Sequence, residues 1–381
     1  MASLYIGLMS GTSLDGVDGV VVDLAGIEAG SGTLDVRAHR SRPFADALAS
    51  ELLALNRPGG TDELHRAALA ANALAALSAQ IVADLLAATG LQPQQVTAIG
   101  AHGQTVRHRP QDFDGVGYTL QLGAPALLAE LTGIDVVADF RSRDVAAHGT
   151  GAPLVPAFHR AVFGRIDASV AVLNLGGMAN LSVLPVDGAV TGFDCGPGNV
   201  LLDLWCRRRT GQPYDAQGRW AASGQVIEPL LQSMWAEPYF ALPAPKSTGR
   251  DLFHSDWLDA HLTSWPDAGA NDVQATLSEL TARVCARDVR SHAAQAQELL
   301  VCGGGALNLD LMQRLARHLP AQSVRPTDDH GLPALQVEAC AFAWLASAFV
   351  NRRSGNLPAV TGATGPRILG ALYPAGRRST I

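Results

Sequence analysis

Hydrophobic residues along this chain occur either in short runs or at helical spacing, and the two patterns alternate. Near the start, two apolar runs flank a polar, glycine-rich segment, which is the pattern of a strand, a tight turn and a second strand. A third stretch alternates with period two and predicts another strand, and two alanine- and leucine-rich stretches predict helices. In chain order these segments are 4–9, 10–18, 19–24, 34–39, 45–55 and 61–89.

The same opening pattern returns in the second half of the chain. Residues 168–185 again read as an apolar strand, a polar turn and an apolar strand. Strands and helices alternate after both openings, which favours the α/β class, and the hairpin starts imply mixed rather than parallel sheets. A length of 381 residues also suits two domains. We therefore expect one architecture used twice, with lobes of residues 1–165 and 166–381.

Composition and charge argue against several classes of protein. The formal net charge is −7 and the basic residues are spread along the chain, which argues against nucleic acid as a partner. We find neither an uninterrupted apolar run of about 18 residues nor a basic segment followed by an apolar stretch at the start. The five cysteines are widely spaced without a CxxC pair, which argues against a disulfide framework or a zinc site. We expect a reduced, cytoplasmic protein with no membrane association.

Three glycine-rich turns follow apolar strands, at residues 11–16, 176–180 and 303–305. None matches the P-loop or the dinucleotide-binding fingerprint. Each turn alone is also explained by a backbone that needs positive φ. Their recurrence at strand ends in both halves is a stronger signal: the two hairpin turns could hold a polyphosphate from two sides, and the third, which opens a helix, could lie against a nucleobase or ribose.

The first of these turns also contains side chains of the kinds that bind a metal ion. Thr12 and Ser13 supply hydroxyl groups, and Asp15 and Asp18 supply carboxylates of the kind that hold hydrated Mg²⁺. The alternative is a hairpin turn that simply needs glycine and aspartate.

Asp194 is a candidate general base. It follows an apolar run and lies among glycines, which leave room for a ligand. A carboxylate in such a place can take a proton from an attacking hydroxyl or water. The alternative is a cap for the helix that begins near Asn199, although Asp194 lies too early for an ideal N-cap.

Other polar residues are candidates for a sugar-binding cleft, although each is also explained as a loop or cap residue. The chain's only lysine, Lys246, lies in a polar loop that is either solvated or part of a site. Glu338 lies on an otherwise apolar predicted helix and faces either solvent or the cleft. The residues that follow short strands in the first half are His102, Gln104, Asp139, Arg141, Arg143 and Asp144.

A set of motifs in this order resembles the anhydro-N-acetylmuramic acid kinase family, within the sugar kinase, Hsp70 and actin superfamily. The similarity runs essentially from end to end and is highly specific. One departure is Cys195, where the family pattern has threonine, and it should affect local hydrogen bonding more than the reaction. The matching segments are 7–18, 102–105, 139–141, 151–156, 173–180, 193–199, 245–250 and 302–306, followed by the helix with Glu338.

The resemblance implies a two-lobed actin-like (ribonuclease H-like) ATPase fold with mixed sheets and a central cleft. It implies that residues 1–165 carry a phosphate hairpin and part of the sugar site. Residues 166–381 would carry a second phosphate hairpin, the catalytic aspartate and the nucleoside-binding region. The implied reaction uses ATP and Mg²⁺ to open the ring of 1,6-anhydro-N-acetylmuramic acid with water and to phosphorylate O6, in cell-wall recycling.

The resemblance also assigns roles to residues at matching positions. Asp194 is implied as the general base that activates water at the anomeric carbon, and Glu338 as a group that orients or protonates the sugar. Arg141 is implied to hold the substrate by charge-assisted hydrogen bonds. ATP and phosphate binding is implied for Gly11, Thr12, Ser13, Leu14, Asp15, Gly16, Val17, Asp18, Gly176, Gly177, Asn180, Gly303, Gly304 and Gly305, sugar binding for His102, Gln104, Phe140 and Arg141, and Mg²⁺ binding through water for Asp15.

Other functions remain compatible with parts of this pattern. A kinase of an ordinary free sugar would use Asp194 equally well, and only the complete motif set separates it. A nucleotide-driven binding or assembly module would share the fold but would not turn over a sugar. A non-catalytic sugar-binding regulator would need a DNA-binding segment, and no basic helix-turn-helix pattern is present. A homodimer is the oligomer that the resemblance implies.

Overall fold

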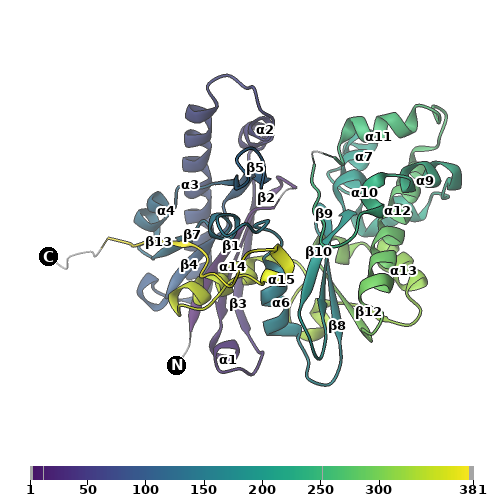
Figure 1. Cartoon of the computed structure of the whole chain (residues 1–381). Coiled ribbons are helices and arrows are strands. Elements are labelled where there is room, and N and C mark those ends of the chain that lie inside the picture. Colours follow the sequence, from purple (N-terminus) through teal and green to yellow (C-terminus); the bar gives the residue numbers. More distant parts are fainter. Residues whose placement is uncertain (1–2, 12, 251, 377–381) are drawn as a thin grey trace. The chain divides into compact units, whose positions relative to one another are not determined.

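The structure is a computed structural model that describes residues 3–11, 13–250 and 252–376. It divides into two compact units (Figure 1). Unit 1 comprises Met1–Val162 together with Gln336–Ile381, and unit 2 comprises Phe163–Leu335. The break after Val162 lies close to the boundary expected at residue 165. Residues 336–381, however, belong with the first unit and not with the second lobe to which the sequence assigned them.

Unit 1 is built on a six-stranded mixed sheet in the order β13-β7-β4-β1-β2-β3. Strands β1, β4 and β7 are parallel to one another, whereas β2 pairs antiparallel with both β1 and β3. A separate two-stranded sheet pairs β5 with β6. The strand bounds are β1 Leu4–Met9, β2 Gly16–Asp23, β3 Asp35–Pro43, β4 Ala98–Ala101, β5 Gln104–Pro110, β6 Gly117–Leu122, β7 Val136–Ala138 and β13 Ala371–Tyr373.

Helices α3 and α14 cover opposite faces of this sheet. A Cβ at Gly19 would meet Ile81 and Leu85 of α3, whereas a Cβ at Gly7 would meet the backbone of α14. Gly19 pairs with Leu8, the neighbour of Gly7, and adjacent residues in a strand point to opposite faces. The helices with residues in unit 1 are α1 Ala25–Glu28, α2 Asp46–Leu55, α3 Glu63–Thr89, α4 Pro125–Thr132, α5 Ser142–Val145, α6 Val155–Phe163, α14 Val337–Val350 and α15 Pro358–Thr361, with a 3₁₀ turn η1 at Pro93–Gln95.

Helix α14 explains why the end of the chain joins unit 1. A Cβ at Gly7 would overlap the carbonyl oxygen of Ala339, and one at Gly100 would overlap that of Phe342. The helix backbone therefore lies directly on β1 and β4, and only glycine permits this approach. In Figure 1 the yellow helix α14 lies beside the purple strand β1, although the two are far apart in sequence.

Within the described part of the chain, α3 is the one helix with the length and apolar composition that a membrane span requires. The structure places its apolar residues Leu74, Ile81 and Leu85 in the core of unit 1, together with Ile6, Leu8 and other strand residues. Alanine and leucine at helical spacing thus serve here to cover the sheet.

Unit 2 repeats the arrangement with a five-stranded sheet in the order β10-β9-β8-β11-β12. Strand β9 is antiparallel to β8 and β10, and β11 is parallel to β8 and β12. Position for position, this is the order and direction of β3-β2-β1-β4-β7 in unit 1. The bounds are β8 Val170–Leu175, β9 Met178–Leu184, β10 Thr191–Pro197, β11 Glu298–Cys302 and β12 Ser323–Pro326. The expected α/β class with mixed sheets, and the expected use of one strand arrangement twice, are confirmed.

Helix α12 is the central helix of unit 2. Fifteen of its residues are buried, including polar ones such as Thr281 and Asp288. The helices of this unit are α7 Val200–Thr210, α8 Arg219–Ala222, α9 Glu228–Trp235, α10 Pro238–Ala241, α11 Ser255–Leu262, α12 Ala270–His292 and α13 Leu309–His318, with 3₁₀ turns η2 at Ala216–Gly218, η3 at Gly304–Leu307 and η4 at Thr327–His330.

Candidate functional site

The carboxyl ends of the parallel strands of unit 1 carry polar residues. Ser10, His102 and Asp139 directly follow β1, β4 and β7, so the topology brings them to one edge of the sheet. A cavity of about 290 Å³ opens there, and all three residues line it. The remaining lining includes apolar side chains of α3 and α4 and the polar side chains of Ser78 and Gln121. A mostly apolar hollow with a few polar groups is typical of a small-molecule site.

Arg141 and His102 form the polar centre of this edge. Arg141 donates from Nε and from a terminal nitrogen to His102 Nε2, at 3.2 and 3.0 Å. A guanidinium can only donate, so Nε2 carries the lone pair and the proton is on Nδ1, which donates to the Ser10 carbonyl at 3.0 Å. Burial, and then the charge of Arg141, lower the pKa of His102 to about 3. His102 is therefore neutral and holds Arg141 in a defined orientation.

The side chain of Gln104 lies outside the cavity lining, although the resemblance implies that it binds the sugar. Its side chain is only 1% exposed and is absent from the cavity lining. Ser10 Oγ donates to its Oε1, and its Nε2 donates to the carbonyl of Gly11 at 3.1 Å. Gln104 thus holds the start of the first glycine-rich turn, and Ser10 is a site residue that the sequence-based list omitted.

Phe140 and Glu338 lie near this edge in different environments. Phe140 is 2% exposed and packs on Phe342 of α14, with ring centroids 5.6 Å apart. Phe342 also lies 4.6 Å from the His102 ring. Glu338 is half-buried in the first turn of α14, one residue before the contact between Ala339 and Gly7 of β1. Phe140 supports the site by packing, whereas Glu338 has a side chain partly open to solvent.

Of the two alternatives for Asp144, a residue that lines the cleft or one that holds a loop, the structure favours the second. Its side chain is fully buried and accepts hydrogen bonds from the Gly151 N–H at 2.8 Å, from Asn356 at 2.7 Å and from Thr361 at 2.8 Å. Gly151 in turn accepts from Arg141 at 2.8 Å. A carboxylate on the short helix α5 is therefore used to fix the loop that holds Arg141, because buried charge needs several donors.

The first glycine-rich turn joins β1 to β2 at the same edge. Leu14 adopts positive φ (59°), and a Cβ at Gly16 would overlap the carbonyl oxygen of Arg42. Asp15 is exposed in this turn, whereas Asp18 lies 3.2 Å from His39 of β3. Thr12, expected to bind phosphate, lies outside the described residues. Val17 is buried and lines the cavity wall.

The described residues contain no group of three or more His, Cys, Asp or Glu side chains arranged to hold a metal ion. Mg²⁺ in phosphoryl-transfer sites is commonly held by one or two carboxylates, with phosphate and water as the other ligands. The exposed carboxylate of Asp15 in a turn rich in N–H groups fits that weaker mode of binding.

Unit 2 aligns its candidate residues across neighbouring strands. Asp194 of β10 pairs with Asn180 of β9, Asn180 pairs with Asn174 of β8, and Asn174 pairs with Cys302 of β11. Cys302 immediately precedes the glycine turn 303–305, and Asn174 lies one residue before the end of β8. The register therefore puts Asp194 and two glycine-rich turns at one edge of the sheet.

Backbone contacts bring the glycine-rich turns of unit 2 together. The N–H groups of Gly198 and Asn199 donate to the carbonyls of Gly177 and Gly176, at 2.9 and 2.8 Å. A Cβ at Gly198 would overlap the Gly176 carbonyl oxygen, and one at Gly305 would overlap Leu175. Glycine is required at both positions because backbone segments cross there without room for a side chain.

Two buried amide oxygens near these turns lack partners. The Oδ1 atoms of Asn174 and Asn180 have no hydrogen-bond partner among the described residues. An unsatisfied buried polar atom is costly, and in native structures it usually marks a ligand, ion or water. The pair therefore supports a polar ligand at this edge.

Asp194 is held by a turn that follows α10. Ser247 Oγ and the Thr248 N–H both donate to Asp194 Oδ2, at 2.7 and 3.1 Å. Helix α7 begins at Val200 with Asn199 at its N-cap position, so the alternative role of Asp194 as its cap is excluded. Asp194 is half-buried and oriented by two donors, as a general base requires.

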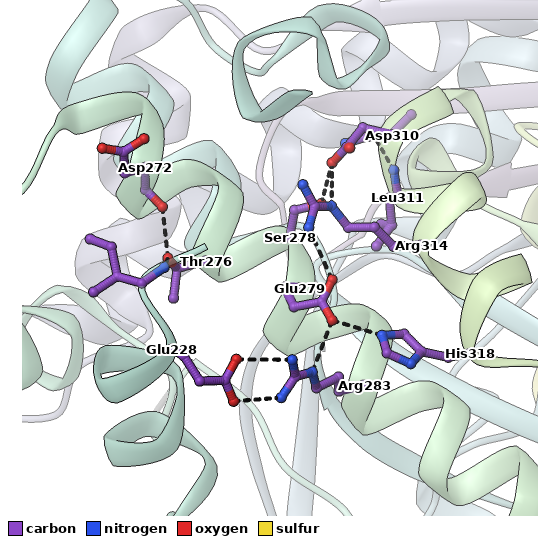
Figure 2. A network of polar contacts seen from close by, with 12 residues as sticks. Glu228, Asp272, Thr276, Ser278, Glu279, Arg283, Asp310, Leu311, Arg314 and His318 are labelled. Atoms are coloured by element: carbon purple, nitrogen blue, oxygen red, sulfur yellow. Dashed lines mark hydrogen bonds and ion pairs between the residues drawn. The ribbon is translucent and has the colours of Figure 1, made fainter. Parts of the chain in front are cut away.

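A second polar network lies between α9, α12 and α13 (Figure 2). Glu279 accepts hydrogen bonds from Arg283 and Arg314, at 2.8 and 2.9 Å, and lies 2.7 Å from His318. Burial raises the pKa of Glu279, but these hydrogen bonds outweigh it and lower the pKa to about 2. The network ties α12 to α13, the helix that follows the glycine turn 303–305. The i,i+4 pairs Glu279–Arg283 and Asp310–Arg314 are the signal in the sequence that would have predicted it.

The amino-acid sequence is similar to known proteins over nearly its whole length. The family model for anhydro-N-acetylmuramic acid kinase matches residues 3–375. A protein of that name from Variovorax paradoxus is 60% identical over 377 residues, covering 98% of this chain and 99% of the relative. The relative of that name from Bordetella pertussis is also 60% identical, covering 98% of this chain and 96% of the relative.

Solved structures are more distant from this chain. An activator of the 2-hydroxyisocaproyl-CoA dehydratase from Clostridium difficile with bound ADPNP has a TM-score of 0.47 at 14% identity, covering 92% of this chain and 96% of that one. A likeness of this size carries no conclusion about function, whereas the family match spans nearly every residue. The chain belongs to the anhydro-N-acetylmuramic acid kinase family.

Proposed function

We propose that this protein is an ATP-dependent kinase that opens the ring of 1,6-anhydro-N-acetylmuramic acid and phosphorylates O6. The products would be N-acetylmuramic acid 6-phosphate and ADP, in cell-wall recycling. The observation that carries the proposal is the alignment of Asp194 with Asn180 and Asn174, beside two glycine-rich turns. A base and a phosphate cradle at one sheet edge are the parts that phosphoryl transfer to a sugar needs.

We assign the sugar to the cavity of unit 1. Its volume of about 290 Å³ and its apolar walls suit a monosaccharide with an acetyl and a lactyl group. Arg141, oriented by neutral His102, is the cation suited to the lactyl carboxylate. Glu338, at the start of α14, is assigned to orient or protonate the sugar.

Asp194 is assigned as the general base. Water attacks the anomeric carbon and loses a proton to the Asp194 carboxylate, while the bond from that carbon to O6 breaks. The freed O6 then forms a bond to the γ-phosphorus of ATP, and the bond from that phosphorus to the leaving oxygen of ADP breaks. Ser247 and Thr248 orient the carboxylate for the first step.

The glycine-rich turns are assigned to ATP. Backbone N–H groups for the phosphates are assigned to Gly11 and residues 13–18 of unit 1, and to Gly176, Gly177, Asn180 and Gly303–Gly305 of unit 2; Thr12 is assigned to ATP by the resemblance alone. Asp15 is assigned to Mg²⁺ through water, and the ion would neutralise phosphate charge when bound. A homodimer, implied by the family resemblance, and a cytoplasmic location, expected from the composition, remain predictions.

The test is ADP release with Mg·ATP and 1,6-anhydro-N-acetylmuramic acid, with N-acetylmuramic acid as the free-sugar control and the product mass recorded. A product heavier than the anhydro sugar by water and a phosphoryl group is the expected result. Phosphorylation of the free sugar alone would overturn the role of Asp194 in ring opening. Absence of turnover with either sugar would overturn the kinase proposal and favour a nucleotide-driven binding module.

A further inference from the structure

Lys246, the only lysine in the chain, is buried instead of solvated. Its side chain and that of Asp288 on α12 are each only 4% exposed, and Nζ lies 3.6 Å from Asp288 Oδ2. That oxygen has no hydrogen-bond partner among the described residues, whereas Oδ1 accepts from the neighbouring Arg287 at 2.7 Å. The Lys246 ammonium group therefore pairs with one oxygen of the buried Asp288 carboxylate. Buried charges need such pairing because each loses its hydration.

The ammonium group also packs against residues that contact Asp194. It lies 4.9 Å from the ring centroid of Tyr239 and donates to the Phe240 carbonyl at 3.4 Å. The Tyr239 hydroxyl donates to the Asp194 carbonyl at 2.7 Å. Burial, and then the charge of Asp194, raise the pKa of Tyr239, so the hydroxyl remains a donor.

The main chain at Lys246 connects the ion pair to the proposed base. The Asp194 N–H donates to the Lys246 carbonyl at 3.0 Å. The next two residues, Ser247 and Thr248, are those that donate to Asp194 Oδ2. Both the backbone and the carboxylate of Asp194 are thus held by three consecutive residues, 246–248.

One face of α12 anchors both sides of this arrangement. Thr281, Cys285 and Asp288 are spaced i, i+4 and i+7, which places them on one helix face. Thr281 donates to the carbonyls of Pro197 and Gly198 at 3.1 and 3.2 Å. Cys285 hydrogen-bonds Cys195, the residue after Asp194, and this contact with burial raises the pKa of the Cys195 thiol.

We infer that the buried Lys246–Asp288 ion pair positions the proposed base by fixing residues 246–248, so that Ser247 and Thr248 orient the Asp194 carboxylate. Lys246 is a positioning residue that acts through its neighbours. The inference rests on the proposed function, because that function assigns Asp194 as the base. It adds a reason why the chain's only lysine is buried next to residues that contact Asp194.

The test compares K246M, D288N and S247A with the wild-type enzyme and with R208M, which removes the exposed Arg208–Asp259 pair elsewhere in unit 2. We expect K246M and D288N to lower kcat about 10- to 100-fold, which is less than the roughly 10²–10⁴-fold contribution of a general base itself, with KM for ATP and ADP affinity unchanged. The acid limb of the kcat–pH profile should move to higher pH, because a carboxylate that loses its donors binds a proton more readily.

Ser247 supplies the decisive measurement if K246M does not fold, because its side chain is exposed and outside the ion pair. S247A should show the same shift of the acid limb without loss of thermal stability, and S247T should restore the wild-type profile. R208M should behave as wild type. The inference is overturned if folded K246M or S247A keeps the wild-type kcat and pH profile, even if its melting temperature falls.

Failure of this inference is distinguishable from failure of the proposed function. If the wild-type enzyme turns over the anhydro sugar and D194N does not, the assignment of the base stands. The profiles of K246M and S247A then decide the role of the ion pair alone. If the wild-type enzyme shows no turnover, the proposed function itself is overturned.

Discussion

The two units share one strand order but support their functional edges with different chemistry. In unit 1 a neutral histidine and a buried glutamine hold the first turn, and the result is a cavity with apolar walls. In unit 2 the buried Lys246–Asp288 ion pair lies next to the residues that hold Asp194, and a second buried charge, Glu279, ties α12 to α13. Under the proposed function, one topology serves two tasks: hydrogen bonds around neutral His102 shape the cavity assigned to the sugar, and a buried ion pair fixes the carboxylate assigned as the base.

The largest effect on kcat is expected when the negative charge of Asp194 in unit 2 is removed. D194N should lower kcat by roughly 10²–10⁴-fold, because an amide cannot accept the proton as a general base. ADP affinity should stay at the wild-type value, measured by calorimetry, because the glycine-rich turns are unchanged. Near-normal turnover in D194N would contradict the division of tasks between the units.

The next effect concerns the close contact between sheet and helix in unit 1. G7A should destabilise unit 1 by about 1–3 kcal/mol, because its Cβ would overlap the Ala339 carbonyl oxygen and force α14 away. Urea unfolding measures the loss. G376A is the matched control, since its Cβ would have only Glu130 within 4 Å, at 3.7 Å. Equal stability of the two variants would show that α14 does not depend on this approach.

A smaller effect is expected from a variant in unit 1 that distinguishes sugar binding from the chemical step. R141M removes the cation while leaving its aliphatic volume, so KM for the anhydro sugar should rise about tenfold or more, as for loss of a charged hydrogen bond. KM for ATP should change little. R143M is the neighbouring control, because the hydrogen bonds to the cavity residue His102 come from Arg141, two residues earlier in the chain. An unchanged sugar KM in R141M would remove Arg141 from the binding site.

The smallest effect is a difference in acid sensitivity. The pKa of His102 is lowered from 6.5 to about 3, and that of Glu279 from 4.5 to about 2. In both cases the unfolded state binds more protons, so stability is lost as pH falls, between 6.5 and 3 for His102 and between 4.5 and 2 for Glu279. Unit 1 should therefore weaken first.

Amide hydrogen exchange in each unit, compared between about pH 7 and pH 5, measures this difference. H102Q should reduce the response of unit 1 over that interval without abolishing it, because burial also lowers the pKa of His159 in this unit to about 3, and it should leave unit 2 unchanged. A steeper loss of protection in unit 2 than in unit 1 would reverse the comparison.

Local pattern predicted the opening hairpins and most long helices well. Residues 61–89 were predicted as a helix that the structure places at Glu63–Thr89, because helical spacing of apolar residues over seven turns has no competing interpretation. The short strands β5, β12 and β13 were not predicted. Strands of three to seven residues with many charged or small side chains carry almost no periodic signal.

The sequence pattern placed several polar residues at this edge of unit 1, but it did not predict the contacts that each of them makes. His102 and Arg141 do form the polar centre of unit 1, but Gln104 and Asp144 are buried supports. Polar residues that follow strands look alike in sequence, and only packing decides which of them point into a cavity. The same limit hid Ser247 and Thr248, whose contact with Asp194 joins segments about 50 residues apart.

The sequence by itself determined the α/β class, the duplicated strand–turn–strand openings, the glycine-rich turns and the family, because these depend on local spacing and on motifs in a fixed order. The tertiary structure alone decided that residues 336–381 return to unit 1, that Asp144 is a buried anchor, and that Lys246 meets Asp288. Each of these depends on which distant segments pack together and exclude water, and hydrophobic burial across long chain separations leaves no short-range pattern to read.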